Sequence, residues 1–470
     1  MSDFKHTEIY ISLLFTAIVG AVGWNTGLFW DNILFVNKMS IPLIENGVFA
    51  WGSIPLQYDP GHPPFIATYM SLMWSLLGRS LHVTHCVLYP FLLLFFWELL
   101  HIAKLICKNH TTAIILVSLV LCDPTIFASL MYIGTEVFIF SFSVVAIRGI
   151  ITNHFWRKTL GLMLLAITSL RGMMLCAGLF LWDVAMMVMI KRVSLRKLCS
   201  WDFLCAYVMA SIPAMIFIIW RLLFKGWITD NPIAPWGDAT GFNDLSDFLF
   251  NFFRNVIVFL QRITDFGRIV LWIIVGVLLW KGRDKIRSNS NILAMLLFIG
   301  CSCVLIIVTS LVIRNPMGHN YFSLVYMGLA FILVELTQNI NWRKSVIALS
   351  MSALFLGNFI VYPDSIAQGW AASLASLPYW DLRKELFAYI DEKQISRSSI
   401  LFKFPFGTCA DDVELNNDER TYAVDIQQAD YFVVSNICNP SDEDLQRTKK
   451  YTPIFHSQKR GVYVTLYKVR

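Results

Sequence analysis

Long apolar runs separated by short polar stretches dominate the first three quarters of the chain. Each run has roughly the length that crosses the hydrocarbon core of a membrane. Lipid offers the backbone no hydrogen-bond partners, so every run is expected to be a helix. The runs cover residues 9–29, 83–105, 112–130, 132–150, 158–170, 172–190, 203–224, 267–281, 290–313, 321–338 and 344–362. This pattern predicts an all-α polytopic membrane protein with about eleven spans.

Two stretches leave the number of spans open. Residues 158–190 could form one long bent segment, although Arg171 and Gly172 near the middle favour a turn between two spans. Residues 64–78 are apolar but short for a span, so we expect an interfacial or re-entrant helix there.

The distribution of Lys and Arg predicts the orientation of the chain. Cytoplasmic loops are enriched in basic residues, and the clearest basic loops lie at 191–197, 281–287 and 343–344. Eleven spans then place the N-terminus inside and the C-terminus outside; a spanning 64–78 would place the N-terminus outside. The first run has no small-residue cleavage site, so we expect a retained anchor rather than a signal peptide.

Three large regions are predicted on the extracytoplasmic side. The first outer loop covers 30–82, the second covers 225–266, and the tail covers 363–470. In the tail, 379–393 has the pattern of an amphipathic helix. Three segments rich in Val, Tyr, Phe and Ile predict strands at 399–404, 430–437 and 461–468. We therefore expect a membrane module, 1–362, followed by a small extracytoplasmic α/β domain, 363–470.

Composition supports a membrane protein and excludes other classes. Apolar residues make up 56% of the 470 residues and charged residues only 15%, against about 25% charged in soluble domains. A soluble globular protein, a disordered chain and a nucleic-acid binder are therefore excluded. The net charge of +6 needs no nucleic-acid partner, because cytoplasmic loops favour Lys and Arg.

The ten cysteines give no metal signature. Eight lie in or beside spans, where they are expected to act as small buried apolar residues. Cys409 and Cys438 lie in the tail and could form a disulfide if that compartment is oxidising. No Cys or His spacing is typical of a zinc site.

The first outer loop holds the strongest candidates for chemistry. Asp31 follows the first apolar run, where partial shielding from water can raise the pKa of a carboxyl group and suit it to general base catalysis. The alternative is an interfacial polar residue that ends a helix. The stiff Pro-Gly-His-Pro-Pro run at 60–64 cannot lie inside a helix. It would hold Asp59 and His62 in place, either to bind a substrate or only to start the next helix.

Further candidates lie at the predicted outer ends of spans. Arg171 interrupts an apolar stretch, and Arg314 and His319 flank a short outer turn. All three could bind a phosphate, and for Arg171 an ionisable residue within a membrane segment indicates function by default. The alternatives are a snorkelling arginine and a solvated loop. Glu136 could hold an acceptor or a metal, or it could be a buried, hydrogen-bonded carboxyl group.

The second outer loop contains a stretch with helical amphipathicity at 244–262. Its apolar stripe predicts a helix on the membrane surface, with Arg254 and Arg262 on the wetter side. Such a helix could line a groove for a lipid tail or simply cover the surface. The preceding segment, 230–238, is rich in Asp and Pro.

The order of these features resembles the GT-C superfamily of membrane glycosyltransferases. A span is followed by an acidic residue, then by Gly-His-Pro-Pro-Phe at 61–65, a short apolar helix that ends in Leu-Gly-Arg-Ser at 77–80, and a second span. The chain is most similar to the branch that contains protein O-mannosyltransferases and bacterial lipid-A aminoarabinose transferases. The likeness covers residues 1–200. Asn315, His319, Asn320 and Tyr321 are also similar to an Arg/Asn-Tyr element that opens a late span in that family.

The resemblance implies a multi-pass enzyme of the inner (plasma) membrane with its active site and its tail on the periplasmic side. It would be an inverting hexosyl- or pentosyltransferase that moves a sugar from a polyprenyl-phosphate carrier to a lipid, glycan or protein acceptor. The family's catalytic base falls on Asp31. The family often has Asp-Glu at that position, whereas this chain has Asp31-Asn32.

Two other membrane classes stay open. A lipid or saccharide flippase usually has internal repeats and helices broken at midplane, and neither is apparent. A polysaccharide polymerase or ligase also has many spans and large outer loops, and only the resemblance at 62–64 argues against it. No dense carboxylate cluster is visible, which favours catalysis without a metal, although a divalent ion stays open.

Overall fold

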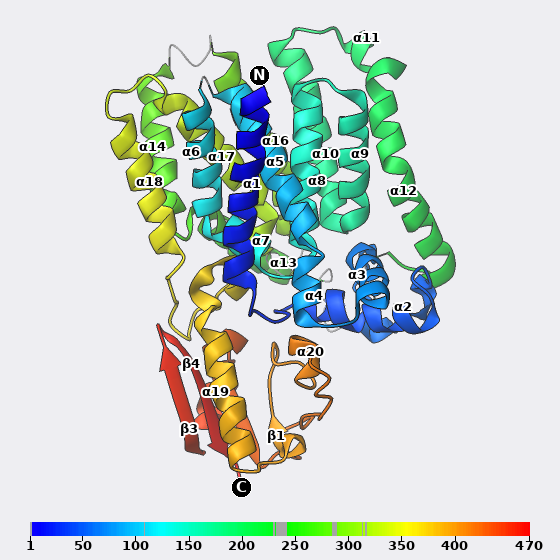
Figure 1. Cartoon of the computed structure of the whole chain (residues 1–470), viewed down its shortest axis with the longest axis vertical. Coiled ribbons are helices and arrows are strands. Elements are labelled where there is room, and N and C mark those ends of the chain that lie inside the picture. The colour runs from blue at the N-terminus through cyan, green and yellow to red at the C-terminus, as the bar shows by residue number, and fades with distance from the viewer. Residues whose placement is uncertain are drawn as a thin grey trace.

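The computed structural model describes residues 2–107, 109–228, 231, 242–283, 289–312, 314 and 317–470. The chain forms a bundle of helices with a smaller, sheet-containing domain at one end (Figure 1). The N-terminus lies at the opposite end of the bundle. Most of the Asp- and Pro-rich segment 230–238, Asn315, and part of the basic loop 281–287 lie outside the described residues.

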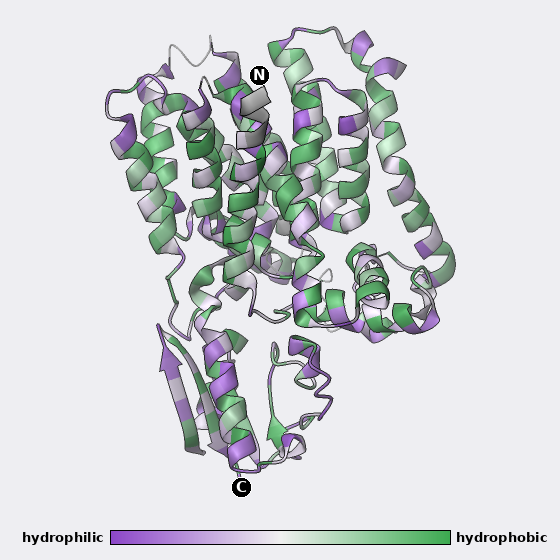
Figure 2. Cartoon of the chain, viewed as in Figure 1, coloured by the Kyte–Doolittle hydropathy of each residue, from purple (hydrophilic) through white to green (hydrophobic). Residues whose placement is uncertain are grey.

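Each apolar run of the sequence contains a helix of the bundle. These helices are α1 (Ser2–Gly23), α5 (Tyr89–Ile106), α6 (His110–Cys122), α8 (Thr135–Ile151), α9 (Phe155–Thr168), α10 (Leu170–Ala185), α12 (Trp201–Lys225), α14 (Arg268–Lys281), α16 (Ser290–Val312), α17 (Ser323–Thr337) and α18 (Arg343–Gly357). Hydrophobic residues cover most of their length, while hydrophilic residues gather at the bundle ends and on the small domain (Figure 2). The chain therefore has the helices of a multi-pass membrane protein.

The turn expected in 158–190 is present. Helix α9 ends and α10 begins at Ser169, whose hydroxyl accepts a hydrogen bond from the Gly172 N–H at 3.1 Å. This N-cap satisfies a backbone donor that would otherwise be left without a partner at the start of α10. The interpretation of two segments is thus confirmed, and Arg171 lies in the first turn of α10.

The count of eleven spans is not confirmed. By length and composition, five segments of the described residues can cross a membrane, or up to seven if two bent helix pairs are each one span. The five are Leu81–Ile106, Leu170–Ile190, Trp201–Lys225, Ser290–Thr309 and His319–Thr337. The expected span 112–130 bends by 78° between α6 and α7 (Pro124–Met131). Asp123 lies at this break, directly after the last residue of α6. Its carboxylate accepts hydrogen bonds from the first free N–H groups of α7 and so favours the start of a new helix there.

The first outer loop forms short helices at the bundle end that faces the small domain (Figure 1). They are the π-helix η1 (Ile33–Lys38), α2 (Ser40–Asn46), α3 (Phe65–Leu77) and α4 (Leu81–Cys86). Helix α3 matches the apolar stretch 64–78, and it is shorter than the helices that can span. The proline pair at 63–64 precedes it, and Gly78 ends it with φ +85°, a conformation that favours glycine.

Helix α13 (Leu245–Thr264) is the amphipathic helix expected at 244–262. It exposes apolar side chains, including Phe250, Phe253 and Ile257, and it buries Asn251 and Asn255. A helix that faces water exposes its polar side chains and buries its apolar ones, whereas α13 does the opposite. An exposed apolar face of this kind suits contact with lipid.

The small domain, 363–470, packs helix α19 (Pro378–Glu392) against a four-stranded sheet of order β1-β2-β4-β3. The strands are β1 (Ile400–Leu401), β2 (Tyr431–Ser435), β3 (Thr452–Lys459) and β4 (Val462–Lys468). The helix and three strands were predicted. Strand β3 was missed because it is a largely exposed edge strand without apolar alternation. The short helices α20 (Asp411–Glu414) and α21 (Asp442–Thr448) were also missed, and both Cys409 and Cys438 are free thiols.

A buried ion pair connects three helices of the bundle. The Arg268 guanidinium, 0% exposed, makes two hydrogen bonds of 2.7 Å to the Asp123 carboxylate. It also donates to Thr125 at 2.6 Å and lies 3.6 Å from the Tyr326 ring centroid. The pair joins α14 to the bend between α6 and α7.

Arg268→Gln should lower the stability of the fold strongly. The substitution leaves the Asp123 carboxylate buried without its cation, which costs about 3–5 kcal/mol. Thermal unfolding of the purified protein in detergent, followed by circular dichroism, measures the effect. Glu392→Gln removes an exposed ion pair with Lys393 and is the control, for which no measurable change is expected. Equal unfolding temperatures for the two variants would contradict this assignment.

Candidate functional site

A cavity of about 320 Å³ lies where the bundle, the first outer loop and the small domain meet. Its walls come from separate parts of the chain that fold together only in the tertiary structure. The lining residues lie at 29–39, 62–66, 129–136, 168–171, 318–321, 368–372 and 439. Six of the eight residues proposed from the sequence line it, namely Asp31, His62, Glu136, Arg171, His319 and Tyr321.

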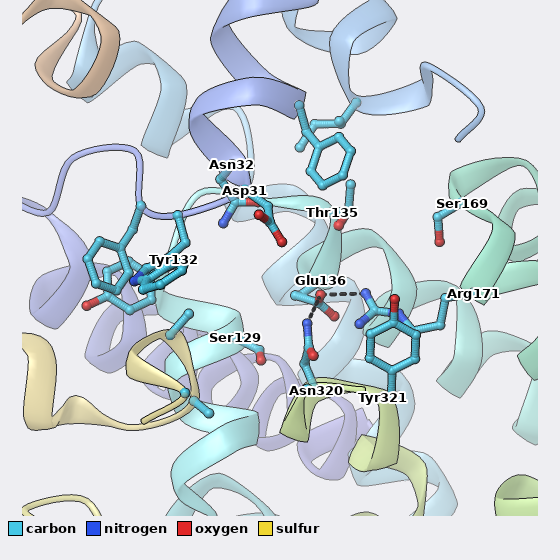
Figure 3. A pocket seen from close by; sticks show the side chains of 18 of the residues that line it. Asp31, Asn32, Ser129, Tyr132, Thr135, Glu136, Ser169, Arg171, Asn320 and Tyr321 are labelled. Atoms are coloured by element: carbon cyan, nitrogen blue, oxygen red, sulfur yellow. Dashed lines mark hydrogen bonds and ion pairs between the residues drawn. The ribbon is translucent and has the colours of Figure 1, made fainter. Parts of the chain in front are cut away.

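Asp31 lies in the cavity wall shortly after α1, and its carboxylate points toward Glu136 (Figure 3). Its side chain is exposed to the cavity rather than to the outer surface of the protein, and it makes no hydrogen bond or ion pair with any described residue. The surrounding protein displaces bulk water, so burial raises the pKa of Asp31 above its ordinary value. The negative charge of Glu136 raises this pKa further, and the positive charge of Arg171 opposes the rise.

The backbone beside Asp31 is strained. Trp30 has φ +50°, a left-handed conformation that costs free energy in a residue with a large side chain. Such strain persists only where the surrounding contacts hold it in place. The position of Asp31 is therefore set by tertiary contacts of this loop rather than by local preference.

Opposite Asp31, a cluster of polar side chains surrounds Arg171 (Figure 3). Arg171 forms an ion pair with Glu136, and the Asn320 amide donates to the same Glu136 oxygen at 2.7 Å. The Arg171 guanidinium also lies 4.8 Å from the Tyr321 ring centroid, a cation–π distance. These contacts from α8, α10 and the loop before α17 fix a cation at the edge of the cavity.

His62 reaches the cavity from the proline-rich turn. Its Nδ1 accepts a hydrogen bond from the Leu170 N–H at 3.3 Å, so the proton of the neutral ring is on Nε2. Burial lowers the pKa of His62 to about 4, and the nearby Arg171 and Arg221 lower it as well. The ring is therefore neutral at pH 7 and can donate one hydrogen bond.

His319 is a buried residue at the opposite wall. Its Nε2 lies 2.9 Å from an Asp265 carboxylate oxygen, and its ring packs in a tilted arrangement against Phe266, with 4.7 Å between the ring centroids. A Cβ added to Gly369 would lie 2.9 Å from His319 Nδ1, so this glycine allows the chain of the small domain to approach the ring. His319 thus joins the bundle to the wall made by 368–372.

The structure does not bring Asp59 and Arg314 to the cavity. Asp59 is buried and pairs with Arg221 of α12 at 2.7 Å, which anchors the proline-rich turn to the bundle. Arg314 is 35% exposed and pairs with Asp247 of α13 at 3.3 Å. Both partners are distant in sequence, so these structural roles were not visible in the local pattern.

The structure adds lining residues that the sequence did not indicate. Ser169 and Thr135 lie among the proposed residues, and the segment 368–372 with Asn439 closes the cavity from the small domain. Ser169 and Thr135 are close in sequence to Arg171 and Glu136 and could have been found by that proximity. Nothing in the sequence marked 368–372, because its place in the wall depends on how the small domain docks.

The described residues contain no group of three or more His, Cys, Asp or Glu side chains that could hold a metal ion. What the cavity does offer is a free carboxylate with a raised pKa, a fixed guanidinium and a neutral imidazole. A carboxylate of this kind can accept a proton from a hydroxyl group near neutral pH. A guanidinium beside it can bind a phosphate and stabilise growing negative charge.

Comparison of the chain with protein-family models, with curated proteins and with solved structures finds no match to any of them. No family is therefore assigned to the chain. The cavity and its charged groups are the basis for a functional hypothesis.

Chemical labelling can test the electrostatics of the cavity. Carbodiimide coupling requires a protonated carboxyl group, so half-maximal labelling of Asp31 should occur above the ordinary Asp pKa of about 3.9. Glu136→Gln should lower this midpoint, because the Glu136 charge raises the pKa of Asp31, and Arg171→Met should raise it. Mass spectrometry of the labelled peptide measures the midpoint, and Asp31→Asn provides the blank. A midpoint at or below the ordinary value would refute the assignment.

Proposed function

We propose that the protein is an integral-membrane glycosyltransferase that uses a polyprenyl-phosphate sugar, with Asp31 as its general base. The observation that carries this proposal is the unpaired Asp31 carboxylate, which shares one cavity with the fixed Arg171 cation at the end of an apolar bundle. A lipid-linked sugar donor suits this site, because the cation can bind its phosphate and the apolar bundle can contact its lipid tail. Its tail stays in the bilayer while its phosphate lies at the membrane surface.

The proposed reaction is a single displacement. Asp31 takes the proton of the acceptor hydroxyl, and the acceptor oxygen bonds to the anomeric carbon of the donor sugar. The bond between that carbon and the phosphate oxygen breaks, and polyprenyl phosphate leaves with the electron pair. The sugar is transferred with inversion, and no oxidant or reductant is consumed.

Arg171 is the proposed partner of the leaving phosphate. The negative charge on the phosphate grows as the bond breaks, and a cation held in position stabilises this charge without rearrangement. Glu136 and Asn320 hold the guanidinium, and Tyr321 supports its face. The neutral His62 can donate a hydrogen bond to the donor or the acceptor.

We further propose that all eleven apolar segments cross or enter the bilayer, in the inner (plasma) membrane, with the cavity and the small domain on the periplasmic side. The basic residues at 191–197, 281–283 and 343–344 support this orientation, because they lie at the ends of helices remote from the small domain (Figure 1). The short helices α2 and α3 and the exposed apolar face of α13 would then lie at the outer membrane surface.

A transfer assay tests the catalytic proposal. The purified protein is reconstituted in liposomes with radiolabelled polyprenyl-phosphate sugars, and release of the sugar and of the free carrier is followed. Asp31→Ala and Asp31→Asn should each lower the rate by about 10²-fold or more, because a general base contributes that much. Asp381→Asn changes an exposed carboxylate of the small domain and should leave the rate unaltered.

Two outcomes of this assay would contradict the proposal. Full turnover in folded Asp31→Asn would remove Asp31 from the role of base. Movement of the labelled lipid across the bilayer without bond cleavage would favour a flippase. A parallel assay with a chelator reports whether turnover needs a divalent ion.

A reporter fusion tests the orientation. Alkaline phosphatase fused after residue 470 should be active, because this reporter folds only outside the cytoplasm, whereas a fluorescent protein at the same point should remain dark. The same pair of reporters fused within the basic loop near 191–197 should give the reverse result. A fluorescent C-terminal fusion would contradict the proposed topology.

A further inference from the structure

Helix α20 of the small domain contacts the chain on both sides of Asp31. On the N-terminal side, the Leu28 N–H donates to the Val413 carbonyl at 2.8 Å. Gly27 lies so close that an added Cβ would be 2.6 Å from the same carbonyl oxygen. The chain that enters the Asp31 loop is therefore held against the small domain.

On the C-terminal side, α20 meets helix η1 through Asp412. The Lys38 ammonium lies 2.5 Å from the Asp412 carboxylate, and the Asn37 amide donates to it at 3.4 Å. The other Asp412 oxygen accepts from the Thr408 N–H at 2.7 Å and from the Thr408 hydroxyl at 2.6 Å. This buried carboxylate therefore has hydrogen-bond partners on both of its oxygens.

Asp411 supplies the second half of the contact. Arg79, just after α3, donates to both Asp411 oxygens, at 3.0 and 2.6 Å. The same guanidinium donates to the Asn37 side-chain oxygen at 2.9 Å. Arg79, Asn37, Lys38, Asp411 and Asp412 together form what we call the polar clamp.

The polar clamp is connected directly to Asp31. The Asp31 carbonyl accepts hydrogen bonds from the Leu34 and Phe35 N–H groups, both at 3.0 Å, so Asp31 is part of the backbone that begins η1. Trp30 also contacts Phe404 of the small domain edge-on, at 5.2 Å between ring centroids. A displacement of η1 or of α20 must therefore move Asp31 relative to the cavity.

The Asp412 carboxylate of the polar clamp is stabilised in its charged form. Burial alone would raise the pKa of Asp412, but hydrogen bonds from Lys38 and Thr408 outweigh this effect and lower the pKa below its ordinary value. The contribution of a carboxylate with a lowered pKa is present at neutral pH and is lost only as the pH falls through that lowered value. Asp412 therefore keeps its negative charge toward Lys38 at neutral pH.

We propose that the small domain positions Asp31 in the cavity, and that Asp411 and Asp412 are the positioning residues that act through Arg79 and η1. The strained backbone at Trp30 is held by the same contacts. The consequence for turnover rests on the proposed glycosyltransferase function, whereas the placement of Asp31 does not. The small domain would therefore be a structural part of the reaction centre rather than a separate binding module.

The test compares Arg79→Gln and Asp412→Asn with the conservative Arg79→Lys, in the full-length protein. Asp444→Asn is the matched control, because Asp444 is a buried carboxylate of the same domain that pairs with Lys403 and does not contact the first outer loop. Gel filtration and unfolding temperature establish that each variant is folded. The readout is the pH midpoint of carbodiimide labelling at Asp31.

Release of the loop should bring water to Asp31 and lower its labelling midpoint by about one pH unit in Arg79→Gln and Asp412→Asn. Arg79→Lys, which keeps the charge but loses the two-pronged contact, should give a smaller shift. Asp444→Asn should give none. The other titratable groups at the cavity are unchanged in every variant, so a shift reports the position of Asp31; these groups are Glu136, Arg171, His62, His319, Tyr132 and Tyr321.

An unchanged midpoint in folded Arg79→Gln and Asp412→Asn would overturn the proposal, and so would an equal shift in Asp444→Asn. In the transfer assay, the clamp variants should lower kcat about 10-fold or more with little change in KM, because a displaced base affects the transition state more than binding. Full transfer activity in Asp31→Asn would refute the catalytic role alone, since the labelling result would still decide whether the small domain positions Asp31.

Discussion

Lipid provides no hydrogen-bond partners for the backbone, and this single constraint shapes the whole molecule. It forces the apolar runs into helices and makes charged groups costly along most of their length. The charged residues that remain are paired, as in the contact between Arg268 and Asp123. The cavity with the unpaired Asp31 carboxylate lies at the end of the bundle, where water can reach a charged group.

The cavity is built by docking rather than by any single element. Helices α8 and α10 supply Glu136 and Arg171, the loop after α1 supplies Asp31, and the small domain closes the remaining wall. Two sets of contacts fix the positions of these parts relative to one another. Ion pairs such as Arg221 with Asp59 attach the outer loop to the bundle, and the polar clamp attaches it to the small domain. The strain at Trp30 indicates that these contacts outweigh the local preference of the chain.

The candidate site shows which residues sequence reasoning can find. Asp31, Glu136 and Arg171 stood out because a charge at the end of an apolar run is conspicuous, and all three line the cavity. Asp59 stood out because it precedes the stiff proline-rich turn, but it is paired with Arg221, more than a hundred positions away in the chain. A local sequence pattern cannot distinguish an unpaired charged side chain, which can bind a ligand, from one that forms an ion pair with a residue far away in the sequence.

The sequence by itself determined the helical membrane module, the amphipathic α13, and the helix and three of the strands of the small domain. These features depend on local periodicity, which each segment carries within itself. Only the tertiary structure decided where α6 bends into α7, which carboxylates are neutralised by a partner, and that the segment 368–372 closes the cavity. Those features depend on contacts between segments far apart in the chain. Such a contact involves two segments at once, so the pattern of either segment alone cannot predict it.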